Sequence, residues 1–242
     1  MNTISFPHPD RVRVIAHRGL SGIETENTCA AFTAAGNRSY FGIETDVHVT
    51  ADGEFVIIHD DNTRRVALED HVVEESSAAV LRSLTLIDRD GGEKTRSDLK
   101  IPLLTEYTRI CRKYEKASVL ELKNPMDPAA TQGIVEEVRR EGWLDKTIFI
   151  SFCHENLTQL RRLLPEARLQ FLTQRPADEE LLQMLLPWRL DLDIHHPALT
   201  QAGIELMHAH GIEVNCWTVD EPDTAARLAS WGVDYITSNI LE

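Results

Sequence analysis

The sequence predicts an α/β fold organised around one parallel sheet of eight strands. Apolar, β-rich runs alternate with helical patterns along most of the chain, the runs number eight, and no low-complexity stretch or linker divides them. Alternation of this kind is typical of repeated βα units. The length of 242 residues is close to the roughly 250 residues of a closed barrel built from eight such units. We therefore expect a single domain over residues 1–242.

Each predicted strand is a short apolar run bounded by turn or helix signals. In chain order the strands are Val12 to Ala16, Gly42 to Asp46, Ser118 to Leu122, Thr147 to Ser151, Arg168 to Leu172, Leu190 to Ile194, Glu213 to Thr218 and Asp234 to Thr237. The helical segments between them are Asn27 to Ala35, Ile101 to Lys116, Pro128 to Glu141, His154 to Leu164, Asp178 to Leu186, Thr200 to His210 and Pro222 to Ser230. Asn27 is expected either to cap the first helix or to make a polar contact in an active site.

One further run, Glu54 to His59, follows the second strand too closely to lie parallel to it. A parallel strand needs a long crossover, whereas an Asp-Gly turn signal favours a hairpin. Centring the turn on Ala51 to Gly53 places His59 beside Thr45. We therefore expect a hairpin arm that adds no strand to the parallel set.

Residues 62–100 are the least regular part of the chain. They are polar, with a loop pattern at 88–93 and some helix expected around Glu74 to Leu84. A long, poorly periodic segment is unusual in a compact domain and often covers a site. The segment is therefore either a surface insertion or a part of the protein that contacts the substrate.

Composition excludes several classes of protein. The net charge of −14 argues against nucleic acid or an anionic membrane as a partner, because both favour a basic surface. We see no signal peptide, and no run approaches the roughly 20 apolar residues of a membrane span, so no stable membrane insertion is expected. The four cysteines form no CxxC pair, which favours free buried thiols in a reducing compartment. The expected location is cytoplasmic, and the sequence leaves a homo-oligomer open.

Three carboxylates lie at the ends of two predicted strands. Glu44 and Asp46 are two residues apart, so their side chains share one face of the strand, and Glu121 lies near the end of the next parallel strand. Carboxylate oxygens suit hard divalent cations such as Mg²⁺ or Ca²⁺. The alternatives are a solvated acidic edge and, for Glu121 with Lys123, a structural ion pair. We interpret the three as candidate ligands of a divalent cation.

Two histidines and two cationic side chains accompany these carboxylates. His17 follows the first strand and His59 arrives on the hairpin, and imidazole titrates near neutrality as acid–base catalysis requires. Arg18 and Lys123 are candidate phosphate contacts, because guanidinium and ammonium groups bind phosphate oxygens. Trp217, on the seventh predicted strand, packs either against an alcohol moiety of a substrate or in the core. The set indicates metal-assisted chemistry on a phosphate.

In their order along the chain, these segments resemble the glycerophosphodiester phosphodiesterase family. The resemblance spans nearly the whole sequence and is carried by HRG, ENT, IETDV, VIIHD, IPLL, LELK, VNCWTVD and WGVDYIT. It implies a TIM (β/α)8 barrel with a β-hairpin excursion after strand 2 and a small insertion at about 62–100. It also implies metal-dependent hydrolysis of a small glycerophosphodiester to glycerol 3-phosphate and an alcohol.

The resemblance assigns a role to each candidate residue. His17 and His59 correspond to the acid–base pair, and Arg18 and Lys123 to phosphate and charge-stabilising contacts. The metal ligands would be Glu44, Asp46 and Glu121, with Mg²⁺ or Ca²⁺ as the cofactor.

Three short segments depart from the family pattern. Thr25 stands where the family usually has Pro, Arg65-Val66-Ala67-Leu68 replaces the usual stretch after His59, and Thr237-Ser238 replaces the closing Thr-Asp. None of them is a proposed acid–base or metal residue, so they bear on substrate preference. Two alternatives stay open: a related barrel lyase that releases a cyclic phosphate, and a non-catalytic barrel that binds phosphodiesters.

Overall fold

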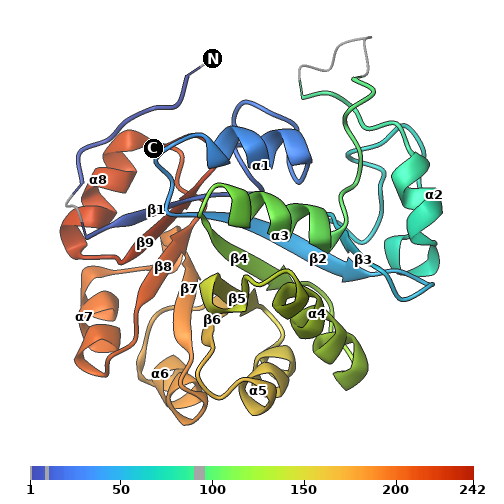
Figure 1. The fold of residues 1–242 in the computed structure, drawn as a ribbon. Coiled ribbons are helices and arrows are strands. Elements are labelled where there is room, and N and C mark those ends of the chain that lie inside the picture. The colour runs from blue at the N-terminus through green and yellow to red at the C-terminus, as the bar shows by residue number, and fades with distance from the viewer. Residues whose placement is uncertain (1, 9–10, 90–95) are drawn as a thin grey trace.

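The computed structural model describes residues 2–8, 11–89 and 96–242, and in this part the chain forms a closed barrel of eight parallel strands surrounded by helices (Figure 1). The pairing of the first strand with the second closes the barrel, with Ile15 opposite Gly42. The predicted TIM (β/α)8 barrel is confirmed. In spatial order its strands are β1 (Arg13–Ala16), β9 (Tyr235–Ser238), β8 (Val214–Trp217), β7 (Asp191–His195), β6 (Arg168–Thr173), β5 (Thr147–Ser151), β4 (Ala117–Leu122) and β2 (Gly42–Val49).

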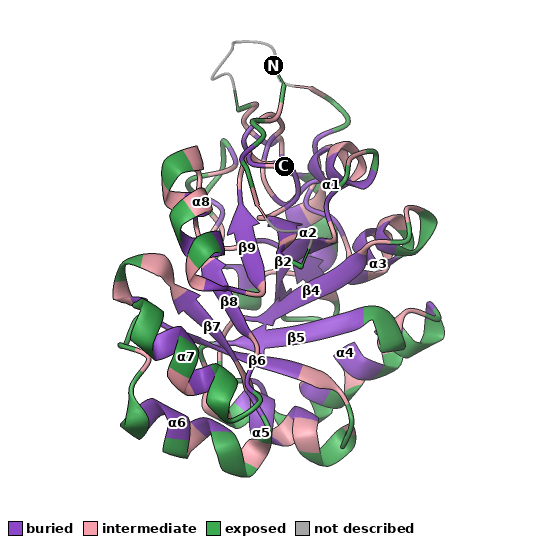
Figure 2. Ribbon diagram, turned by 90° about the vertical axis from the view of Figure 1, so that its left-hand side faces the viewer, coloured by how far each residue is buried: buried purple, intermediate pink, exposed green. Residues whose placement is uncertain are grey.

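Helices follow the strands and cover the outside of the barrel. Figure 2 shows the strands buried along most of their length, while the helices have exposed outer faces. Each predicted helix is present, with its ends shifted by a few residues. The helices are α1 (Cys29–Gly36), α3 (Leu104–Lys113), α4 (Pro128–Arg140), α5 (His154–Leu163), α6 (Glu179–Leu185), α7 (Gln201–Ala209) and α8 (Pro222–Trp231), with short 3-10 turns at Val73–Glu75, Leu144–Lys146, Leu186–Trp188 and His196–Ala198.

The predicted hairpin is also confirmed. Strand β3 (Phe55–Ile57) pairs antiparallel with β2, and Val47 lies opposite Ile57. The same register continued by two residues places His59 opposite Thr45, as the turn pattern predicted. The hairpin therefore brings a histidine to the carboxyl end of the barrel without adding a barrel strand.

The segment after the hairpin packs around a small apolar core of its own. It contains the predicted helical turn, α2 (Ala78–Ser83), which lies to one side of the barrel (Figure 1). Of the loop predicted at 88–93, residues 90–93 lie outside the described part of the chain. The buried side chains of this core are Val56, Ile58, Ala67, Val73, Ala78, Leu81, Leu84, Leu86, Leu99 and Ile101.

The space inside the barrel is apolar at mid-height and polar at its ends. Ile15, Val119, Ile148 and Leu172 belong to one buried cluster within the ring of strands. Alternation along each strand directs every second side chain into this space. Charged residues gather beyond the apolar layer, at the carboxyl and the amino ends of the strands.

Two predictions about the whole chain bear on its surroundings. The four cysteines are free, with Cys111 and Cys216 buried as expected and Cys29 and Cys153 only half-buried. In the described ranges, no helix is long and apolar enough to cross a membrane.

Candidate active site

Three carboxylates from two adjacent strands meet at the carboxyl end of the barrel. The register of β2 and β4 places Asp46 opposite Glu121, and Glu44, Asp46 and Glu121 each have one oxygen within 4.8 Å of the others. All three are buried, with 4%, 1% and 6% of their surface exposed. Within the described residues, Asp46 Oδ1 and Glu121 Oε1 accept no well-aligned hydrogen bond. Buried carboxylate oxygens that accept no hydrogen bond are suited to coordinate a divalent cation, so the three residues fit the predicted metal.

One ammonium group lies beside this cluster. Lys123 follows β4, and its Nζ is 2.8 Å from Glu121 Oε1 and 3.4 Å from Asp46 Oδ1. The two oxygens therefore lie within ion-pair distance of Lys123 although neither contact has hydrogen-bond geometry. A cation at this place partly offsets the negative charge of the three carboxylates.

Burial and charge together set the ionisation of the cluster. Burial, reinforced by the charge of Asp46, raises the pKa of Glu44 well above its usual value and that of Glu121 to about 8. Burial would also raise the pKa of Asp46, but Lys123 and Arg18 outweigh it and hold that pKa below its usual range. A bound divalent ion would favour the ionised form of all three carboxylates.

The backbone after β1 turns sharply to place Arg18 over the carboxylates. Arg18 has a φ of 52° and Gly19 a φ of 77°, both left-handed. A Cβ on Gly19 would lie 2.8 Å from the Cβ of Ala31 in α1, so this position requires glycine. The turn directs the Arg18 N–H to Glu44 Oε2 at 2.8 Å. The HRG segment thus ties the first strand to one of the candidate metal ligands.

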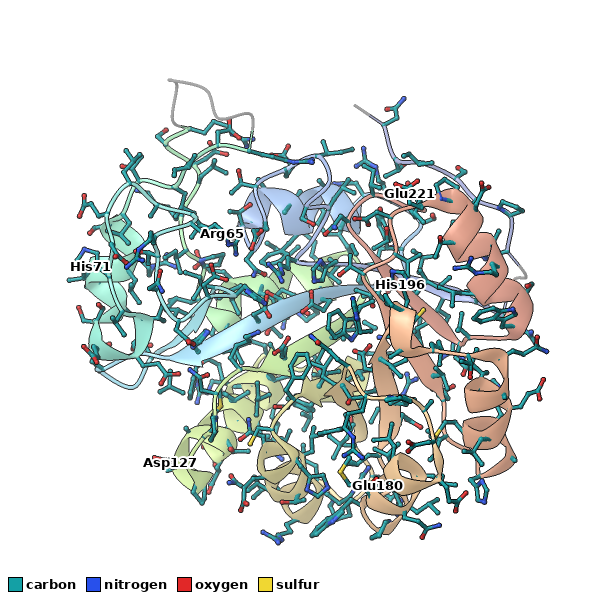
Figure 3. All side chains as sticks on the ribbon, turned by 180° about the vertical axis from the view of Figure 1, so that it is seen from behind. Arg65, His71, Asp127, Glu180, His196 and Glu221 are labelled. Atoms are coloured by element: carbon teal, nitrogen blue, oxygen red, sulfur yellow. The ribbon has the colours of Figure 1, made fainter. Side chains whose placement is uncertain are left out.

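The Arg18 guanidinium is held from two sides. Its Nη1 donates to Glu26 Oε1 at 2.9 Å, and its Nε lies 3.6 Å from Asp46 Oδ2. Glu26 also accepts from Arg65, which belongs to the insertion and is labelled in Figure 3. The insertion is thereby connected to the site, although sequence reasoning assigned no role to Glu26 or Arg65.

His17 is oriented by a chain of two side chains. Its Nδ1 is 2.8 Å from Asn239 Oδ1, and Asn239 Nδ2 donates to Asp220 Oδ2 at 2.6 Å. Because Asp220 fixes which way the Asn239 amide points, we assign the proton of His17 to Nδ1, which leaves Nε2 as an acceptor. His17 Nε2 lies 4.0 Å from Glu44 Oε2. Burial, aided by the charge of Arg18, lowers the pKa of His17 to about 4, so the imidazole is neutral at pH 7.

His59 is also oriented through its Nδ1 by a chain of two side chains. Its Nδ1 is 2.6 Å from Asp60 Oδ1, and Arg65 Nε donates to Asp60 Oδ2 at 2.8 Å. Asp60 therefore accepts the Nδ1 proton and leaves Nε2 free. Burial lowers the pKa of His59, with Arg18 adding to the effect against the opposing charge of Asp46. Both histidines consequently present a free Nε2.

Asn27 does not cap the first helix. The cap of α1 is Thr28, whose hydroxyl accepts from Ala31 N at 3.2 Å. Asn27 instead adopts a left-handed φ of 52° and donates from Nδ2 to Asp46 Oδ2 at 2.8 Å. Its Oδ1 accepts from the Thr45 hydroxyl at 2.7 Å. Of the two predicted roles, capping is wrong and the polar contact is confirmed.

The structure brings together His17, Arg18, Glu44, Asp46, His59, Glu121 and Lys123. Sequence reasoning missed Asn239, Asp220 and Asp60. Asp60 directly follows His59, which was a signal that could have been used. Asp220 follows β8 and Asn239 follows β9. A position just beyond the carboxyl end of a barrel strand was the sequence signal that could have indicated both as site residues.

Two cavities lie at this end of the barrel and share His59, Glu121 and Phe152. The inner cavity, of about 80 Å³, is lined by His17, Arg18, Glu44, His59, Glu121, Ile150, Phe152, Leu172, Asp193, Trp217, Thr218 and Thr237. The outer cavity, of about 480 Å³ and more open, is lined by His59, Asp60, Asp61, Asn62, Glu121, Lys123, Asn124 and Phe152.

Trp217 packs in the core as one of its two predicted roles requires, and its contact with a substrate stays a prediction. It lines the inner cavity and also packs against the apolar cluster inside the barrel. Its ring centre lies 5.7 Å from that of Phe152 and 5.0 Å from that of His195. His196, labelled in Figure 3, is the next residue of the segment after β7. Trp217 is therefore part of the cavity wall and anchored in the core at once.

The chain is similar in sequence and structure to known phosphodiesterases. Residues 17–241 match the model of the glycerophosphoryl diester phosphodiesterase family. A glycerophosphodiester phosphodiesterase of Caldanaerobacter subterraneus subsp. tengcongensis is 28% identical over 93% of each chain, and one of Bacillus subtilis is 25% identical over 96% of this chain and 84% of its own. Among solved structures, a phosphodiesterase of Oleispira antarctica in complex with the product sn-glycerol-3-phosphate has a TM-score of 0.84, with 25% identity, covering 98% of this chain and 96% of that one.

Proposed function

The chain belongs to the glycerophosphoryl diester phosphodiesterase family, and from this membership and its site we propose that the carboxyl end of its barrel hydrolyses glycerophosphodiesters to glycerol 3-phosphate and an alcohol. The observation that carries the proposal is the buried set of Glu44, Asp46 and Glu121, in which two oxygens accept no hydrogen bond from the described residues. The free Nε2 atoms of His17 and His59 lie at the same site. The site therefore combines the groups that phosphodiester hydrolysis needs.

Glu44, Asp46 and Glu121 would hold one divalent cation, either Mg²⁺ or Ca²⁺. When bound, the cation supplies positive charge that offsets the charge developing on the phosphate oxygens. The choice between the two ions stays open, because both prefer carboxylate oxygen.

Arg18 and Lys123 bind and orient the phosphate. Both side chains are largely shielded from solvent, with 16% and 13% exposed. Shielding strengthens their attraction for non-bridging oxygens, since the local dielectric is lower than that of water. Arg18 is already fixed by Glu26, so little orientation entropy is lost when the phosphate binds.

His17 and His59 move the protons. One Nε2 accepts the proton of the attacking hydroxyl, which belongs either to water or to the glycerol half of the substrate. The other imidazole enters the reaction protonated on both nitrogens, and it donates its Nε2 proton to the alcohol oxygen as the bond between that oxygen and phosphorus breaks. Asn239 and Asp60 hold Nδ1 of the two rings, so that both rings turn Nε2 toward the reaction.

The two cavities suit the two halves of the substrate. The inner one is smaller and more enclosed than the outer one, which fits a constant three-carbon group. The outer one is wider and open, which fits an alcohol of variable size. We place the glycerol half in the inner cavity and the leaving alcohol in the outer one.

A cytoplasmic location stays a prediction. The four free thiols are compatible with a reducing compartment. Whether copies of this chain associate into a homo-oligomer also stays open.

Product analysis by phosphorus NMR tests the function. We expect glycerophosphocholine and glycerophosphoethanolamine to yield glycerol 3-phosphate when Mg²⁺ or Ca²⁺ is added, and to remain intact with a chelator. A cyclic phosphate that persists would identify a lyase instead. Absence of turnover on a wide panel of glycerophosphodiesters with either ion would overturn the proposal and favour a binding protein.

A further inference from the structure

The wall of the inner cavity contains a carboxyl group that neither the metal ligands nor the acid–base pair require. Asp193 lies in the middle of β7 and is 2% exposed. Its neighbours Leu192 and Ile194 belong to the core between the barrel and the helices. Since successive side chains alternate between the faces of a strand, Asp193 points into the barrel. There it lines the inner cavity together with Glu121 and Trp217.

The protein itself satisfies only part of this carboxyl group. Asn215 lies directly opposite Asp193 on β8, and its side chain favours the ionised form of the carboxyl. The Asn215 amide is also engaged by Gln170 at 3.3 Å and by the Thr237 hydroxyl at 3.1 Å. Asp193 Oδ1, in contrast, has no hydrogen-bond partner in the described part of the chain. A buried polar atom without a partner is costly, so a ligand that pairs with it gains affinity.

The surroundings of Asp193 indicate the kind of group that pairs with it. Trp217 Nε1 is a second buried polar atom left without a partner by the described residues. Ile150 and Leu172 contribute apolar surface to the same cavity. Unpaired polar atoms beside apolar surface suit a short carbon chain that bears hydroxyl groups.

A hydroxyl group is suited to Asp193 in either of its protonation states. Burial, with the charge of Glu121, raises the pKa of Asp193 well above its usual value. The protonated carboxyl donates a hydrogen bond and the ionised one only accepts, whereas a hydroxyl can do both. A phosphate oxygen would be repelled by the ionised form.

We propose that Asp193 is a specificity-determining residue that hydrogen-bonds a hydroxyl on the glycerol half of the substrate. The hydroxyl in question is the one farthest from the phosphate, because β7, which carries Asp193, lies across the barrel from β2, which carries Glu44 and Asp46. The inference rests on the proposed function and adds to it the residue that reads the glycerol group.

The test compares two substrates that differ by this hydroxyl alone. The first is glycerophosphocholine, and the second is the choline phosphodiester of 1,2-propanediol, which keeps the hydroxyl next to the phosphate-bearing carbon. In the wild type we expect kcat/KM to favour glycerophosphocholine by about 10- to 100-fold, because the analogue leaves Asp193 unpaired. In Asp193→Leu the preference falls below about threefold. Asp193→Asn keeps most of it, since the amide both donates and accepts.

A neighbouring residue provides the matched control. Leu172→Val changes the shape of the same cavity without touching a hydrogen bond, so it lowers kcat/KM for both substrates by a similar factor. Calorimetry adds a readout that does not depend on turnover: glycerol 3-phosphate binds the wild type more tightly than 1,2-propanediol 1-phosphate, and Asp193→Leu loses this difference.

The outcomes separate the inference from the function on which it rests. A wild type that hydrolyses both substrates equally well, or an Asp193→Leu variant with undiminished preference, overturns the role of Asp193 and leaves the hydrolase intact. A wild type that hydrolyses neither of these substrates, nor any other glycerophosphodiester of a wide panel, overturns the proposed function. If Asp193→Leu does not fold, the substrate ratio of the wild type and that of Asp193→Asn decide.

Discussion

Both ends of the barrel hold charged side chains inside the ring of strands, but the two ends differ in how deeply these side chains are buried and how they are hydrogen-bonded. At the amino ends, the Tyr235 hydroxyl accepts from Arg13 and Arg168 and donates to Glu213 at 2.7 Å. Arg168 also donates to Glu213 at 2.9 Å, and the Arg13 guanidinium stacks 5.3 Å above Phe41. These side chains are also partly exposed, with 38% of Arg13, 40% of Arg168 and 35% of Glu213 accessible to solvent.

The carboxyl end uses the same residue types but buries them more deeply, and several of their atoms have no hydrogen bond although ion-pair partners lie nearby. Asp46 Oδ1, Glu121 Oε1, Arg18 Nε and Asp193 Oδ1 all lack a hydrogen-bond partner among the described residues. The three carboxylates of the candidate metal site have Arg18 and Lys123 as their cationic neighbours. The comparison teaches that buried charges with incomplete hydrogen bonding mark the candidate site, whereas partly exposed and hydrogen-bonded charges form a structural network.

The largest expected effect comes from the two histidines at the carboxyl end of the barrel. His17→Ala and His59→Ala each lower kcat by about 10²- to 10⁴-fold, because each removes a positioned proton-transfer group. Steady-state hydrolysis of glycerophosphocholine measures the loss. His210→Ala is the matched control, since His210 is exposed and bonds only to the carbonyl of Leu206 in its own helix. A variant at His17 or His59 that keeps near-full activity would remove that residue from the mechanism.

This comparison also explains what the sequence could predict. The strands and the hairpin were predictable because each has a local signal, such as the Asp-Gly turn at Asp52 and Gly53. The cluster of three carboxylates was predictable because Glu44 and Asp46 share one strand face and Glu121 lies at the same end of the next parallel strand. Asn239 and Asp220 were not, because their role is a hydrogen-bond chain between two separate loops.

Asn27 illustrates a second limit of sequence reasoning. Asn and Thr are both good helix caps, and nothing local decides between Asn27 and Thr28. The choice depends on Asp46, which engages the Asn27 amide from another strand. The role of Asp193 could not be predicted for the same reason. Its Oδ1 lacks a hydrogen bond in a fold where the neighbouring Asn215 bonds with Gln170 and Thr237, which come from other strands.

A carboxyl group at the amino end should affect stability alone. Burial raises the pKa of Asp191 from its usual 3.8 to about 6. The folded state therefore binds this proton more tightly than the unfolded state, and ionisation of Asp191 lowers stability as the pH rises from about 4 to about 6. Asp191→Asn removes this penalty, so we expect the variant to be more stable than the wild type by about 1–3 kcal/mol at pH 7 and nearly equal to it at pH 4.

Urea denaturation at both pH values measures the difference for Asp191→Asn, and kcat at pH 7 should be unchanged. The structural reason is that the Asp191 carboxyl accepts a hydrogen bond only from the Glu213 backbone, far from the metal ligands along the strands. A stability gain of the same size at pH 4 would show that the charge of Asp191 is not its cause.

The smallest expected effect comes from the hydrogen-bonded network around Tyr235 at the amino ends of the strands. Tyr235→Phe removes one hydroxyl from the network and leaves Arg168 and Arg13 with Glu213 as a partner. Since the acceptor Glu213 remains in place, we expect a loss of about 1 kcal/mol in the free energy of unfolding, measured by urea denaturation. The apolar layer of the barrel separates this network from the site, so kcat should stay within about twofold of the wild type. A tenfold fall in kcat with a normal unfolding free energy would mean that the two ends are coupled through the barrel, and incomplete pairing would then no longer suffice to delimit the site.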